Sequence, residues 1–251
     1  MRITKAILAT NELSHYRHYW PWVARAWRRL GIEPVVADLR TADIAPLDGN
    51  EGIVVSIPVS SQHLHTAHAA QCIRLLLGCL FPDDVCILSD IDMLPISVDY
   101  FVQGAHIAQE MDDRVVVFRP FQYIPEGNGN MNPDQIPICY VAARGTTWRE
   151  LFPGVTSMAD IIRQLEEWQK KDLNWCADQR FLHQHVAAFP LERVVLLKDA
   201  ETGFVRIDRG DVPIMSKTHI DLSGYSDFHM PGFQPNRAYL LGLLNTLGIS
   251  S

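Results

Sequence analysis

The chain has 251 residues, of which 47% are hydrophobic and 20% are charged, so it is long enough to bury a substantial core and too apolar to be disordered. Its formal net charge of -7 argues against a general nucleic-acid binder and against a protein that binds anionic membranes through charge. An anionic substrate would therefore need local positive charge, from a cation or from a few arginines.

The first third of the chain predicts alternating strands and helices. Runs of the kind found in buried strands occur at residues 5–10, 33–38 and 52–59. Apolar residues at helical spacing predict one helix at residues 15–30 and a second at residues 62–81. This order predicts an α/β protein with a mixed, mostly parallel sheet flanked by helices.

The next predicted strand, residues 85–88, runs directly into two carboxylates one residue apart, Asp90 and Asp92. If the chain is still extended there, both side chains point to one side. Paired carboxylates repel unless something positive lies between them, and hard divalent cations prefer such oxygen ligands. A solvated loop after the strand is the ordinary alternative, but the small Ser89 and the apolar Ile91 favour a metal site.

In open α/β sheets, ligands bind at the carboxyl ends of strands where the strand order reverses. If the first strand and the Asp-x-Asp strand are neighbours, Thr10 and Asn11 border the same crevice as the two acids. Arg74 is a lone cation on an apolar helix, and two roles remain open for it. It either extends to solvent along its alkyl stem or reaches an anionic ligand behind the strand.

The second half of the chain continues the α/β pattern without a linker or repeat, which predicts a single domain. Asp178 lies near the start of a helix that ends at about residue 188, where it either caps that helix or presents a carboxylate to the crevice. Residues 121–135 are rich in Pro, Gly and Asn and predict a long lid or binding loop. A turn-rich segment at residues 226–233 carries His229. Further strands are predicted at residues 114–119, 136–143, 193–198 and 204–208, and further helices at residues 98–109, 147–152, 157–171 and 236–247.

The number and spacing of the cysteines indicate the redox state of the compartment in which the protein is found. The chain has five, none of them in a C-x-x-C pair, and several lie in apolar runs, which predicts buried thiols in a reducing environment. No segment is apolar over the length of a membrane span, and the first apolar stretch is too short for a signal peptide. We therefore expect a soluble cytoplasmic protein, with peripheral membrane association left open.

Taken in order, these motifs resemble the GT-A type of glycosyltransferase, the metal-dependent class with an Asp-x-Asp motif. The resemblance extends over most of the chain. It rests on the early strand that ends in Thr10 and Asn11 and on the segments QCIRLLLGCLFPDD, VCILSDIDMLPIS, ICYVAARGTTWRELF, CADQRFL and DFHMPGF. It implies one GT-A domain (1–251), with a nucleotide-binding half at residues 1–95 and an acceptor-binding half with the tail at residues 96–251.

The resemblance also implies the site residues. Asp90, Asp92 and His229 would hold a divalent metal, Mn²⁺ or Mg²⁺, and one imidazole ligand favours Mn²⁺. The tail reads His-Met-Pro-Gly and has Gln-Pro-Asn where related glycosyltransferases usually have Lys-Pro-Trp. The resemblance therefore carries over the histidine of the tail but not its phosphate contacts. The residues that the resemblance assigns to the nucleotide-sugar are Thr10, Asn11, Arg74, Ser89, Asp90 and Ile91.

The implied reaction moves a hexosyl or deoxyhexosyl group from a UDP- or GDP-type nucleotide-sugar to a glycan or another hydroxyl acceptor. An inverting enzyme needs a base for the acceptor hydroxyl, and Asp178 is the first candidate, with Asp208 and Glu126 behind it. A retaining enzyme can work without such a base. We expect inversion slightly more than retention.

Other classes share parts of this pattern. A HAD-type phosphohydrolase also uses Asp-x-Asp at a strand end, but normally on its first strand and followed by Thr or Val, whereas Met93 and Leu94 follow here. A sugar nucleotidyltransferase usually opens with a Gly-rich basic loop, which residues 10–20 lack. A non-catalytic carbohydrate-binding relative would keep the fold and lose the metal ligands, which this sequence retains.

Overall fold

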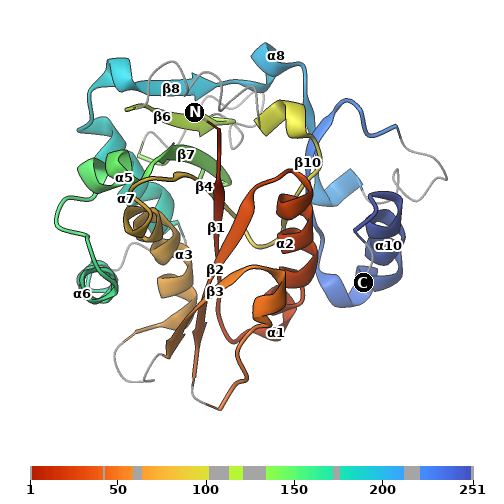
Figure 1. Cartoon of the computed structure of the whole chain (residues 1–251), viewed down its shortest axis with the longest axis horizontal. Helices are drawn as coiled ribbons and strands as arrows, with labels where there is room; N and C mark the ends of the chain where they lie inside the picture. Colours follow the sequence, from red (N-terminus) through yellow and green to blue (C-terminus); the bar gives the residue numbers. More distant parts are fainter. Residues whose placement is uncertain are drawn as a thin grey trace.

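The structure is a computed structural model, and it describes residues 2–41, 43–58, 64–101, 113–120, 134–171, 176–211 and 221–249. Figure 1 shows a central sheet with helices on both sides and a smaller sheet beside it. The predicted mixed α/β class is therefore correct.

The larger sheet has seven strands in the order β3-β2-β1-β4-β7-β6-β8. Its first four strands are parallel neighbours, β7 runs antiparallel to both β4 and β6, and β8 is parallel to β6. β1 pairs with β4, so the strand that ends in Thr10 lies beside the strand that leads into the acids, as predicted. The strands are β1 Lys5–Thr10, β2 Glu33–Arg40, β3 Ile53–Pro58, β4 Val85–Ser89, β6 Val115–Phe118, β7 Tyr140–Arg144 and β8 Val194–Leu197.

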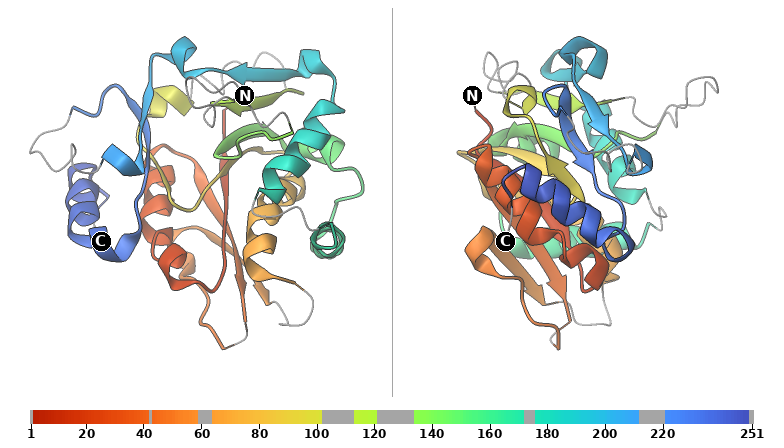
Figure 2. Two further views of the ribbon diagram at one scale, coloured as in Figure 1. Left: turned by 180° about the vertical axis from the view of Figure 1, so that it is seen from behind. Right: turned by 90° about the vertical axis from the view of Figure 1, so that its right-hand side faces the viewer.

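Alternate residues of β1 contribute to two separate cores, one on each face of the sheet. Ala6 and Leu8 belong to the core under α2 Trp20–Arg29 and α10 Phe233–Thr246. Ile7 and Ala9 belong to the opposite core, which also contains residues of the remaining long helices. Figure 2 shows α10 on the same side of the molecule as α2. The helices that supply the second core are α3 Thr66–Leu77, α5 Gly145–Leu151, α6 Met158–Gln169 and α7 Ala177–Ala187.

The second sheet has three strands in the order β5-β10-β9, namely Met93–Pro95, Tyr225–His229 and Val205–Ile207. β5 begins directly after the two acids, and β10 ends at His229. The segment at residues 226–233 is expected to be turn-rich, and that expectation is wrong for residues 226–229. They are extended because they pair antiparallel with β5 on one side and parallel with β9 on the other.

Two predicted helices are each divided in the structure. The helix expected at residues 15–30 is broken into α1 Ser14–Arg17 and α2, because Pro21 stands in the first turn of α2 and lacks the amide hydrogen that a continuous helix would need. The helix expected at residues 62–81 becomes α3 followed by the 3₁₀ turn Gly78–Leu80. The strand expected at residues 136–143 begins only at Tyr140. The remaining short elements are α8 Asp199–Thr202 and the 3₁₀ turns Gly49–Glu51, Leu191–Arg193 and Arg209–Asp211.

Some predictions concern residues that the structure does not describe. Most of the helix expected at residues 98–109, nearly all of the loop expected at residues 121–135, and Glu126 lie outside the described residues. Four of the five cysteines are buried free thiols, as predicted, and Cys176 is partly exposed. In the described part of the chain, no helix has the length and apolar character needed to cross a bilayer.

Candidate functional site

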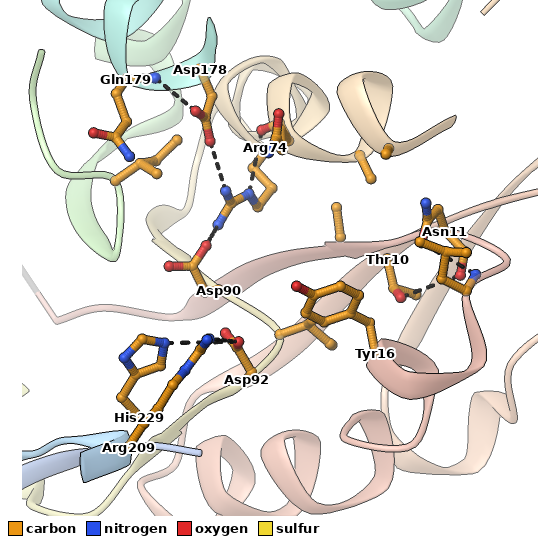
Figure 3. Close-up of a pocket in the computed structure, with 17 residues that line it drawn as sticks. Thr10, Asn11, Tyr16, Arg74, Asp90, Asp92, Asp178, Gln179, Arg209 and His229 are labelled. Atoms are coloured by element: carbon orange, nitrogen blue, oxygen red, sulfur yellow. Dashed lines mark hydrogen bonds and ion pairs between the residues drawn. The ribbon is translucent and has the colours of Figure 1, made fainter. Parts of the chain in front are cut away.

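A pocket with a cavity volume of about 410 Å³ opens at the carboxyl ends of β1 and β4. Its wall contains Thr10, Asn11, Asp90, Asp92 and His229, which come from distant parts of the sequence. Figure 3 shows their side chains arranged around this space. The volume lies in the usual range for small-molecule sites. The other lining residues are Ala9, Leu13, Tyr16, Ala67, Ala70, Gln71, Arg74, Ile91, Ile138, Asp178, Gln179 and Arg209.

The chain turns between the two acids instead of staying extended. The amide of Met93 donates to the carbonyl of Asp90 at 3.2 Å, which closes a tight turn between β4 and β5. The expectation that both carboxylates point to one side of an extended strand is therefore wrong. Both line the pocket, but Asp90 faces Arg74, and Asp92 faces Arg209 and His229 (Figure 3).

Arg74 is the centre of a buried ionic network. Its guanidinium pairs with Asp90 and donates to Asp178 Oδ2 at 2.9 Å and to the carbonyl of Ser89 at 3.2 Å. The predicted role in which Arg74 extends to solvent is wrong, because the guanidinium is buried and its partners are carboxylates of the chain itself. Arg74 also lines the pocket, so contact with an anionic ligand stays a prediction. Arg74 therefore neutralises the acids that flank it and fixes where they point.

The network separates the pKa values of its two acids. Burial acts to raise the pKa of Asp90, but the charge and hydrogen bond of Arg74 outweigh it and leave that pKa below its ordinary value. Burial raises the pKa of Asp178 to about 6, although Arg74 opposes the shift. Asp178 is not the N-cap residue of α7, which is Cys176; it lies in the first turn, where its Oδ1 accepts from the amide of the next residue, Gln179, at 2.9 Å. A carboxyl group that titrates near neutral pH is suited to proton transfer.

The small sheet brings His229 to Asp92. In the β5–β10 ladder His229 lies opposite Met93, and the amide of Met230 donates to the carbonyl of Asp92 at 2.9 Å. His229 Nε2 is 3.8 Å from Asp92 Oδ2, and Arg209 pairs with the same carboxylate. Burial and the charge of Asp90 raise the pKa of Asp92. A cation at this point would therefore relieve an unfavourable concentration of negative charge.

Two carboxylates and an imidazole at one end of a pocket are ligands that suit Mn²⁺. Asp92 and His229 already converge, but Asp90 is turned toward Arg74. Consistent with this, the described residues contain no cluster of three histidine, cysteine or acidic side chains close enough to hold a metal ion as arranged. The donor set fits a divalent cation, provided that Asp90 and Arg209 reorient their side chains.

The opposite end of the pocket is formed by the end of β1. Thr10 is buried, and Asn11 Oδ1 accepts from the amide of Leu13 at 3.3 Å, which holds the chain as it turns away from the sheet. Ile91 also lines the pocket. Ser89 is not among the lining residues, because its side chain is buried and its hydroxyl donates to the carbonyl of Asp90 at 3.1 Å.

Sequence reasoning missed Tyr16, Gln179 and Arg209, all of which line the pocket. Gln179 follows Asp178 in the motif CADQRFL, so the prediction that Asp178 faces the crevice could have been extended to the next residue. Arg209 follows Asp208, which was a secondary candidate for the base. Asp208 contacts His229, with Oδ1 at 3.0 Å from Nδ1.

No protein-family model and no curated protein matches the sequence. Solved structures do match. The galactosyltransferase LgtC, in complex with donor and acceptor sugar analogs, is 18% identical over 91% of this chain and 87% of its own, with a TM-score of 0.52. The apo form of the glycosyltransferase GlyE from Streptococcus pneumoniae is 12% identical over 92% of this chain and 55% of its own, with a TM-score of 0.50. With its mostly parallel seven-stranded sheet between helices, the chain has the GT-A fold of these glycosyltransferases.

Proposed function

We propose that this protein is a glycosyltransferase that uses Mn²⁺, or Mg²⁺, to transfer a hexosyl or deoxyhexosyl group from a UDP- or GDP-type sugar to a hydroxyl of a glycan. The observation that carries the proposal is that Asp90, Asp92 and His229 all line one pocket, which opens at the carboxyl ends of β1 and β4. Ligands bind at this edge in open α/β sheets. The fold shared with LgtC, whose structure contains donor and acceptor sugar analogs, supports the same class of reaction.

When bound, a divalent cation would act as a Lewis acid on the donor diphosphate and stabilise the charge of the leaving nucleoside diphosphate. Asp90, Asp92 and His229 would hold it. Thr10 and Asn11 border the end of the pocket at β1, where they would contact the nucleotide.

Asp178 is the proposed base. It lies in the pocket wall, and burial raises its pKa to about 6, so above that pH its carboxylate can accept the proton of an acceptor hydroxyl. Arg74 would position this carboxylate through the 2.9 Å hydrogen bond. This role belongs to an inverting reaction, which we favour slightly over retention. The anomeric configuration of the product, read by ¹H NMR, decides between the two.

The test is a thermal-shift screen of nucleotide-sugars with and without Mn²⁺, followed by detection of the released nucleoside diphosphate. We expect one donor to raise the melting temperature by several degrees only when Mn²⁺ is present. The variant Asp92→Asn is the matched control, because it keeps the size of the side chain and removes its charge. Failure of every donor to stabilise the protein, combined with hydrolysis of p-nitrophenyl phosphate, would instead support a phosphohydrolase.

A further inference from the structure

One surface turn contacts two of the three proposed metal ligands. β9 ends at Ile207, and the next two residues, Asp208 and Arg209, reach His229 and Asp92 respectively. Figure 3 shows the side chains of Arg209 and His229 side by side, both directed at Asp92. The guanidinium of Arg209 thus occupies the side of Asp92 on which a cation would bind.

The turn is well anchored. The amide of Asp211 donates to the carbonyl of Asp208 at 2.9 Å, and the amide of Asp208 donates to Asp211 Oδ2 at 2.8 Å. Ile207 pairs with Phe228 in the β9–β10 ladder, directly beside His229. The backbone of the turn is therefore held in place and positions the side chains of Asp208 and Arg209 at the site, while the side chains themselves can still change rotamer.

Asp208 determines which nitrogen of His229 faces the site. A carboxylate accepts hydrogen bonds, so His229 Nδ1 donates to Asp208 Oδ1 across 3.0 Å. This leaves Nε2 facing Asp92 Oδ2 at 3.8 Å, a separation too long for a good hydrogen bond. The ring is therefore held with Nε2 in the position of a metal ligand, as acidic partners of ligating histidines commonly do.

The two arginines of the site differ in how easily their guanidinium groups can move away from their carboxylate partners. Arg74 is buried and tied to both Asp90 and Asp178. Arg209 has 48% of its side chain exposed, so its guanidinium can move into solvent at little cost. Displacement of Arg209 would leave Asp92 open on the side where His229 Nε2 already points.

We propose that Arg209 is a built-in counter-ion that holds Asp92 in the metal-free protein and competes with the divalent cation for it. The proposal rests on the function proposed above. Arg209 thereby weakens metal binding and prevents repulsion between Asp90 and Asp92 until a cation arrives. Asp208, on the same turn, keeps His229 oriented throughout the exchange.

The test measures Mn²⁺ binding alone, by the EPR signal of the free ion, so it does not depend on activity. We expect Arg209→Gln to bind Mn²⁺ about fivefold more tightly than the wild type, since Asp92 is buried but its arginine partner is half-exposed and solvent-screened, which limits the pair to about 1 kcal/mol. Arg209→Lys should lie between the two. Arg163→Gln is the matched control for net charge, because Arg163 is an exposed arginine paired to Asp160 on α6, and it should bind Mn²⁺ as the wild type does.

The outcomes separate this proposal from the proposed function. Equal or weaker Mn²⁺ binding by Arg209→Gln, with clear binding by the wild type, overturns the competition and leaves the metal site intact. Absence of Mn²⁺ binding in both proteins overturns both. If circular dichroism shows that Arg209→Gln does not fold, the Mn²⁺ affinity of Arg209→Lys is compared with that of the wild type instead. An affinity no higher than that of the wild type refutes the competition between Arg209 and the cation.

Discussion

Replacing Arg74 with methionine tests the ionic network that organises the pocket. The substitution keeps a long unbranched side chain and removes the guanidinium that pairs with Asp90 and Asp178. The Asp178 side chain is only 4% exposed, so its charge loses its partner in a place that water hardly reaches. Breaking a buried pair in this way typically costs about 3–5 kcal/mol of unfolding free energy.

The size of the effect should depend on pH. Burial raises the pKa of Asp178 from 3.8 to about 6, a shift of about 2 units that corresponds to roughly 3 kcal/mol. Because the folded-state pKa is raised, the stabilising contribution of this group is fully present below pH 3.8 and is lost as the pH rises through 6. Without Arg74, which lowers this pKa, the folded value rises further, and stability continues to fall through pH 8.

The assay is urea unfolding followed by tryptophan fluorescence at pH 5 and pH 8. We expect Arg74→Met to lose about 3 kcal/mol at pH 8 and about 1 kcal/mol at pH 5. The double variant with Asp178→Asn should recover about 2 kcal/mol at pH 8, because neither charge is then buried alone. An equal loss at both pH values, or additive losses in the double variant, would refute the reasoning.

Three further predictions concern the site and the fold. Asp92→Asn should weaken Mn²⁺ binding at least about 100-fold, since the proposed metal site loses one of its carboxylates, while far-UV circular dichroism stays unchanged. Asp178→Asn should preserve donor binding and lower the rate of transfer. In the wild type, kcat/KM should rise as the pH passes through about 6, where the Asp178 carboxyl loses its proton, and this rise should disappear in the variant. Unchanged turnover would show that Asp178 is not the base. Gly145→Ala should cost about 3 kcal/mol or more, because its Cβ would lie 2.0 Å from the carbonyl oxygen of Phe81, whereas Gly49→Ala, with nothing within 4 Å, should leave the urea midpoint almost unchanged.

The parts of the site that lie on buried strands could be predicted from the sequence. Runs such as Val85–Ser89 are apolar on both faces, which is typical of the centre of a parallel sheet, and the position of Thr10 beside the acids follows from strand adjacency. The roles of Arg74 could not be predicted in the same way. Its partners Asp90 and Asp178 are 16 and 104 residues away, and composition says nothing about contacts at that range.

Of the small sheet, β9 lies within the strand predicted at residues 204–208, but β5 and β10 were not predicted. β5 has three residues, too few to show an alternating pattern. β10 contains a fully buried acid, Asp227, which would count against a strand if it were unpaired. Arg206 and Arg119 neutralise it, at 2.7 Å and 3.2 Å, and only the folded structure brings those two arginines together.

The antiparallel pairing of β5 with β10 has a consequence for synthesis on the ribosome. Thr10 and the two acids of the turn after β4 are synthesised well before His229 and before β10, the strand that pairs with β5. A nascent protein therefore displays the two acids long before His229 exists, so the proposed metal site could not be assembled until β10 has been synthesised. Stalled chains of increasing length should thus gain their tertiary packing before they gain tight Mn²⁺ uptake.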